Sequence, residues 1–130
     1  MPDTRNASGS ERSVLIVEDN VALRESLSGL LAARNIAVES ASDGLDALER
    51  LECGFRPCLI ILDLQMAGVD GRAFLCARRL DAGIRAIPVV AVSSHQVGFD
   101  VRQFNVVGVL TKPIDADRLL RLVEDYVRFH

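Results

Sequence analysis

The sequence contains only three cysteines, and none of them forms a C-x-x-C pair. An odd number of separated cysteines excludes a disulfide framework and a zinc site of the usual spacing. It favours reduced thiols and hence a cytoplasmic protein. We expect Cys53, Cys58 and Cys76 to be mostly buried packing residues.

Long apolar runs and a surplus of positive charge are also missing. The longest apolar run covers residues 86–92 and includes Pro88, which is far short of the roughly 20 residues needed to span a membrane. Residues 1–12 are polar and lack the apolar stretch of a secretory signal. The 15 lysines and arginines against 18 acids give a net charge of −3, which argues against a nucleic-acid partner.

The 130 residues, of which 49% are hydrophobic, are enough for one domain with its own core. Residues 1–12 show no periodicity, and we expect them to be a disordered leader. The regular pattern starts at Ser13, so we place the single folded domain at residues 13–130.

Short apolar runs alternate with amphipathic segments along this domain. Five runs, at residues 14–17, 36–40, 58–62, 88–92 and 106–110, predict strands. Leucines at 23, 27, 30 and 31 predict one face of a helix after the first strand. Five strands alternating with five helical segments predict an α/β fold, a single doubly wound parallel sheet with helices on both faces.

The later helices have predicted inner and outer faces. We expect three sets of side chains to point inward: Leu45, Leu48 and Leu51; Phe74 and Ala77; and Leu119, Leu122, Val123 and Tyr126. The arginines on these helices are expected on solvated faces: Arg78, Arg79, Arg118, Arg121 and Arg128.

Polar residues follow the apolar runs at the carboxyl ends of the predicted strands, where ligands bind in doubly wound sheets. Glu18 and Asp19 follow the first run, Asp63 the third, Ser93 the fourth and Lys112 the fifth. Clustered carboxylates repel one another, and a Mg²⁺ ion relieves that repulsion. With a lysine and a hydroxyl alongside, Asp63 becomes a candidate nucleophile towards phosphorus.

Four segments resemble the receiver domain of two-component response regulators and occur in that family's order. They are residues 14–20 (VLIVEDN), 61–71 (ILDLQMAGVDG), 88–93 (PVVAVS) and 111–113 (TKP). The resemblance implies a flavodoxin-like sheet with strand order 2-1-3-4-5. It also implies a stand-alone signalling protein that takes a phosphoryl group from a sensor histidine kinase or a histidine phosphotransfer protein, and then signals by protein contact or relays the group.

The same resemblance assigns roles to individual residues. Asp63 is expected to be the phosphoacceptor, and Asp19 a direct Mg²⁺ ligand, with Glu18 acting through a water. Gln65 is expected to lend its backbone carbonyl to the metal. Ser93 matches the switch hydroxyl, and Lys112 matches the lysine that contacts the phosphoryl group. A cis bond is expected before Pro113.

Some positions depart from the family pattern. Ala67 replaces a common proline, and Val109 stands where an aromatic residue is usual. The segment 95–105, expected to hold the fourth helix, is short and contains Gly98, so we expect a frayed helix and an output that needs no aromatic rotamer switch. Gln65 and His95 stand where similar receivers line the path of the attacking water, which predicts an effect on phosphoryl lifetime.

Four other functions remain open. A small aspartate-nucleophile phosphatase generally needs a second acid two residues after the nucleophile, and that position holds Gln65. A pseudo-receiver would act only as an interaction module, although all the charged site residues are present. A hydrolytic triad with His95 lacks the G-x-S-x-G turn. A flavodoxin-like electron carrier lacks a Ser/Thr/Gly-rich phosphate loop in its first turn. We therefore predict a signalling protein, not an enzyme.

Overall fold

The computed structural model describes residues 13–66, 71–94 and 104–128. The predicted leader at residues 1–12 and most of the predicted fourth helix at 95–105 lie outside these residues. His95 and Ala67 do as well. The side chain of the last described residue is likewise not described.

Five parallel strands form one sheet in the order β2-β1-β3-β4-β5. They are β1 (Ser13–Val17), β2 (Ala37–Ala41), β3 (Leu59–Asp63), β4 (Val89–Ser93) and β5 (Val106–Thr111). Every residue of β1, β3 and β4 is buried, as expected for strands covered on both faces. The predicted doubly wound sheet and its strand order are confirmed.

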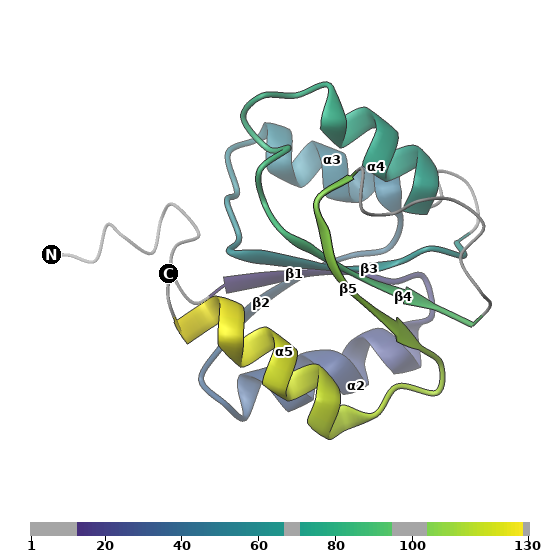
Figure 1. The fold of residues 1–130 in the computed structure, drawn as a ribbon, viewed down its shortest axis with the longest axis vertical. Helices are drawn as coiled ribbons and strands as arrows, with labels where there is room; N and C mark the ends of the chain where they lie inside the picture. The colour runs from purple at the N-terminus through teal and green to yellow at the C-terminus, as the bar shows by residue number, and fades with distance from the viewer. Residues whose placement is uncertain (1–12, 67–70, 95–103, 129–130) are drawn as a thin grey trace, which may run out of the picture.

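Four helices in the described residues cover the two faces of the sheet (Figure 1). The helices α2 (Val21–Ala32) and α5 (Ala116–Arg128) lie on one face, and α3 (Gly44–Glu52) and α4 (Gly71–Arg79) lie on the other. Each face has its own apolar core, one built around α2 and α5 and the other around α3 and α4. The sheet therefore separates two helical layers and leaves its strand ends open.

Polar side chains fix where the helices begin. The Asn20 side chain caps α2 by accepting a hydrogen bond from the Leu23 N–H at 3.0 Å. The Asp43 side chain caps α3 by accepting a hydrogen bond from the Asp46 N–H at 2.8 Å. The Asn20 cap matters for the site, because it starts α2 directly after Glu18 and Asp19 at the end of β1.

Some predicted inner faces are wrong by one residue. Leu45 is 52% exposed and Ala77 is exposed, whereas Ala47, Leu51, Phe74 and Leu75 are buried. A single residue step rotates a side chain about 100° around a helix, so a neighbour of an inward residue points to solvent. The same rotation leaves Cys76 exposed. Cys53 follows the end of α3 and is also exposed, so the prediction of buried thiols holds for Cys58 alone.

Arg78 is the largest departure from the sequence-based expectation, because it is only 1% exposed. Its guanidinium donates hydrogen bonds to the carbonyl oxygen of Phe104 at 2.7 Å and to that of Ile87. Burial lowers the pKa of Arg78 to about 10. Arg78 thus ties the end of α4 to the chain entering β4 and β5, while its neighbour Arg79 is exposed above the Phe104 ring.

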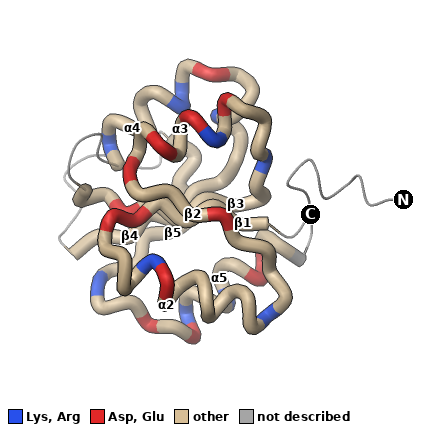
Figure 2. Tube along the Cα trace, turned by 180° about the vertical axis from the view of Figure 1, so that it is seen from behind, with Lys and Arg blue, Asp and Glu red and all other residues tan. Residues whose placement is uncertain are grey.

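The remaining surface charges are mixed. Figure 2 shows segments with Lys or Arg interleaved with segments with Asp or Glu on the helices of both layers, with no continuous basic band among the described residues in this view. Arg118 and Arg121 are exposed, as predicted. Across the described ranges, none of the helices combines the length and apolar character required to cross a bilayer.

Candidate functional site

The carboxyl ends of β1, β3, β4 and β5 bring four of the predicted site residues to one edge of the sheet. Glu18 follows β1, Asp63 and Ser93 end β3 and β4, and Lys112 follows β5. The register places Asp63 beside Val92 and Ser93 beside Thr111, so these strand ends are level. Residues far apart in the sequence therefore share one small volume.

Three carboxylates form the acidic part of this site. Oxygen atoms of Glu18, Asp19 and Asp63 all lie within 4.8 Å of one another. Glu18 and Asp63 are each 2% exposed, whereas Asp19 is exposed and opens the cluster to solvent. The pKa of Glu18 is raised to about 7, mainly by burial and in addition by the negative charge of Asp63. The hydrogen bond from the Asn20 N–H acts in the opposite direction and lowers the pKa.

Lys112 supplies the positive charge of the site. Its ammonium group lies 3.2 Å from Asp63 Oδ2 and 3.5 Å from Glu18 Oε1. Partial burial lowers the pKa of Lys112, but the charges of Asp63 and Glu18 outweigh that effect and raise it overall. The lysine is therefore held in its charged form, and the bond to Pro113 is cis, as expected.

Gln65 contacts both Asp63 and Ser93. Its backbone N–H donates to Asp63 Oδ1 at 2.9 Å. Its side-chain Nε2 donates to Ser93 Oγ at 2.9 Å, and its Oε1 accepts from the Ser94 N–H at 3.0 Å. Sequence reasoning assigned Gln65 a backbone role and an effect on lifetime, and it missed the side-chain bond to Ser93, because a loop conformation decides that contact.

Two further residues support the site, and the sequence predicted no role for either, although Gly71 ends one of the four segments that resemble the receiver family. Arg24 on α2 donates to the backbone carbonyl of Glu18 at 2.7 Å, which fixes the turn after β1. Gly71 at the start of α4 packs directly against the backbone of Asp63 and Leu64. Both contacts act on the backbone that carries the acidic residues.

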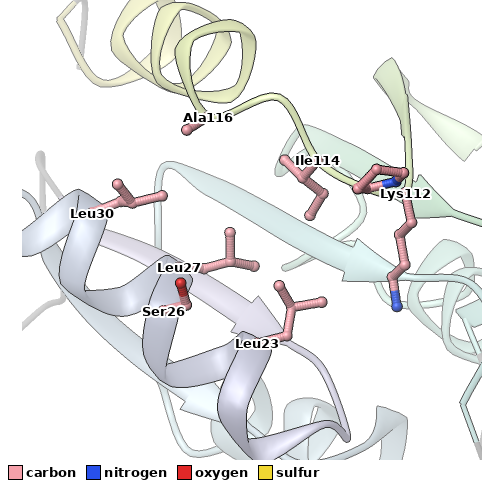
Figure 3. A pocket seen from close by; sticks show the side chains of 8 residues that line it. Leu23, Ser26, Leu27, Leu30, Lys112, Ile114 and Ala116 are labelled. Carbon is pink, nitrogen blue, oxygen red and sulfur yellow. The ribbon is translucent and has the colours of Figure 1, made fainter.

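An apolar cavity of about 340 Å³ lies beside the acidic site, between α2 and the segment joining β5 to α5 (Figure 3). Figure 3 shows Leu23, Leu27 and Leu30 on α2 facing Ile114 across the cavity. Lys112 lines the same cavity, and its side chain extends away from Leu30 in this view. Lys112 therefore borders the cavity and also contacts the Asp63 carboxylate.

A doubly wound sheet with three carboxylates and a lysine at its strand ends presents the groups that a divalent cation and a phosphoryl group would bind. The profile of the response regulator receiver domain matches residues 14–124. The chain belongs to this family, whose members are signalling proteins of two-component systems.

Relatives and solved structures agree with this assignment. The polar-differentiation response regulator DivK of Brucella anthropi is 31% identical over 119 residues, which cover 89% of this chain and 96% of DivK. Protein PilG of Pseudomonas aeruginosa is 28% identical over 117 residues, covering 88% of this chain and 86% of PilG. A receiver protein from Pseudomonas putida superimposes with a TM-score of 0.82 at 31% identity, covering 89% of this chain and 98% of that one. The chemotaxis protein CheY4 of Vibrio cholerae gives 0.81 at 25% identity, with coverage of 90% and 99%.

Proposed function

We propose that Asp63 accepts a phosphoryl group from the phosphohistidine of a sensor histidine kinase or histidine phosphotransfer protein. The observation that carries this proposal is the position of the Asp63 carboxylate, buried at a strand end with Oδ1 bonded to the Gln65 N–H and Oδ2 to Lys112. Membership of the receiver family supports the reaction class. We place the transfer in the cytoplasm, where the separated cysteines remain reduced.

The acidic cluster fits a magnesium ion. The donors of the cluster are carboxylate oxygens, which are the ligands that hard divalent cations take. Asp19 and Asp63 would bind Mg²⁺ directly, together with the backbone carbonyl of Gln65, and Glu18 would act through a water. When bound, the cation neutralises charge on the carboxylates and on phosphoryl oxygens.

The chain's own residues supply the remaining steps. An Asp63 carboxylate oxygen attacks phosphorus, a new O–P bond forms, and the P–N bond to the donor histidine breaks with its electron pair returning to the ring nitrogen. The Lys112 ammonium group then contacts a phosphoryl oxygen, and the Ser93 hydroxyl donates to another. These groups position the phosphoryl group and neutralise its charge. Positioning and charge neutralisation provide most of the catalysis that phosphoryl transfer requires.

The apolar cavity next to Lys112 fits the donor protein. A phosphohistidine must approach Asp63 from outside the strand ends, and the leucines of α2 border that approach. A helix that carries the histidine buries apolar side chains against such a groove. We propose that Leu23, Leu27 and Ile114 form this docking surface.

A comparison of two donors tests the docking surface. Ser26→Tyr adds bulk at an exposed position that lines the cavity without touching the acidic residues. Phosphorylation by a histidine phosphotransfer protein should slow by at least tenfold, while phosphorylation by acetyl phosphate stays unchanged. Leu45→Ser, on the opposite face of the sheet, is the matched control and should leave both rates unchanged. Equal slowing with both donors would contradict the docking proposal.

We propose that the chain does not turn over phosphate esters. Gln65 occupies the position where an aspartate-nucleophile phosphatase needs its second acid, and its side chain is engaged with Ser93 and Ser94. Incubation with aryl and sugar phosphates should release no phosphate above background. Sustained release that is lost in Asp63→Asn would instead show a phosphatase.

A further inference from the structure

The Gln65 side chain joins the loop after the acceptor strand β3 to the carboxyl end of the neighbouring strand β4. Gln65 follows the acceptor strand β3, Ser93 ends the neighbouring strand β4, and Ser94 follows Ser93. Three contacts cross between them: Nε2 to Ser93 Oγ at 2.9 Å, and Oε1 to the Ser94 N–H at 3.0 Å and to the Ser94 Oγ at 3.4 Å.

The orientation of the Gln65 amide follows from these partners. A backbone N–H only donates, so the amide oxygen must face Ser94. The amide NH₂ group therefore faces Ser93, and because this group only donates, Ser93 Oγ accepts the bond. The hydroxyl of a fully buried serine is thus held by a side chain from the acceptor loop.

The Ser93 hydroxyl oxygen accepts the bond from Gln65, and no contact joins Ser93 to the Asp63 side chain among the described residues. Within the described residues, the side-chain contacts of Asp63 are with the Gln65 N–H, Lys112 and Glu18, and those of Lys112 are with Asp63 and Glu18. For Ser93 to donate to a phosphoryl group on Asp63, its Oγ must reorient, and the bond from Gln65 Nε2 opposes that movement.

We propose that the Gln65 side chain is a latch that holds the Ser93 hydroxyl in its resting orientation, so that phosphorylation of Asp63 must break the Gln65–Ser93 bond to reach the active state. Gln65 is a positioning residue in this scheme, since it acts through Ser93. The latch rests on the proposed function of Asp63. The latch stabilises the resting state relative to the active state. The phosphoryl group must therefore favour the active state by a larger difference in affinity to shift the equilibrium.

Beryllofluoride, a phosphoryl analogue that binds aspartate carboxylates together with Mg²⁺, measures the equilibrium directly. Gln65→Met removes the amide while keeping a side chain of similar length at an exposed position. Loss of one hydrogen bond in the resting state should make this variant bind beryllofluoride about fivefold more tightly than wild type. In a Ser93→Ala background, the same Gln65→Met change should increase the affinity much less, because the bond to Ser93 is already absent and only the Ser94 contacts are lost.

The side-chain amide resonances of Gln65, assigned by their loss in Gln65→Met, provide a signature that a purely structural role would not produce. They should shift in wild type on addition of beryllofluoride, and should already be shifted in free Ser93→Ala. Equal analogue affinities of wild type and Gln65→Met, or an equal gain in the Ser93→Ala background, would overturn the latch. Wild type that fails to bind the analogue, or an Asp63→Asn variant that binds it equally well, would overturn the proposed function and the latch with it.

Discussion

Gly71 packs so closely against Asp63 that a Cβ atom at Gly71 would lie 2.7 Å from the Asp63 carbonyl oxygen. The same atom would lie 2.6 Å from Leu64 Cα, so both clashes are with backbone and neither is relieved by a side-chain rotation. The start of α4 therefore sets the path of the chain that leaves the acceptor strand.

We predict that Gly71→Ala displaces this loop. The variant should lose about 1–3 kcal/mol of unfolding free energy, because the backbone must shift to admit the methyl group. It should also accept phosphoryl groups from acetyl phosphate more slowly than wild type. Gly29→Ala is the matched control: it lies in an exposed helix interior with no atom within 4 Å of the added Cβ, and it should gain about 0.5–1 kcal/mol. Urea unfolding of both variants checks the prediction, and equal effects would contradict it.

Arg78 is predicted to be a major contributor to stability. Arg78→Ala leaves the carbonyl oxygens of Phe104 and Ile87 without this donor and opens a cavity under α4, which should cost about 3 kcal/mol. Arg78→Met should cost less, because it fills much of the volume and removes the need to bury a charge. Urea unfolding measures both.

The neighbouring Arg79 provides the control for this change. It is exposed, and its contact with the Phe104 ring, 5.4 Å from the guanidinium carbon, is worth about 0.5–1 kcal/mol. A loss in Arg79→Ala as large as that in Arg78→Ala would show that the buried hydrogen bonds do not carry the effect.

Glu18 makes folding stability depend on pH. Its pKa rises from 4.5 to about 7 on folding, so between these values the folded state binds more protons than the unfolded state. This contribution is fully present below pH 4.5 and is lost as the pH rises through about 7. In metal-free buffer, wild type should lose stability relative to Glu18→Gln across this window, and Mg²⁺ should recover part of the loss. A constant difference between the two proteins from pH 4.5 to 7 would refute the prediction.

The sheet and the strand-end residues are predictable from the sequence because each depends on a local pattern. Apolar runs such as residues 58–62 mark buried strands, and parallel strands bring the residues that follow them to one edge. The strand limits observed for β3 and β4 differ from the predicted ones by only one residue. The order of apolar runs and polar residues is therefore enough to bring Asp63 and Lys112 together.

What the sequence did not reveal depends on contacts between distant segments. The sequence predicts a solvent-exposed arginine at the end of an amphipathic helix. Arg78 is instead buried, and its hydrogen bonds to the carbonyls of Phe104 and Ile87 offset the cost of removing its charge from water. Likewise, Leu45 is apolar but lies one residue away from the inward face of α3. The bond from Gln65 to Ser93 requires a particular loop path, which periodicity does not specify.

The central claim, that Asp63 is the phosphoacceptor, is tested most directly by intact mass. The protein is incubated with acetyl phosphate and Mg²⁺, and the mass of wild type is compared with that of Asp63→Asn. Wild type should gain one phosphoryl group, and the gain should disappear when Mg²⁺ is chelated. Asp63→Asn should remain folded, and be as stable as wild type or more so, because one of three repelling carboxylates is neutralised. A phosphoryl gain by Asp63→Asn at the wild-type rate would contradict the assignment.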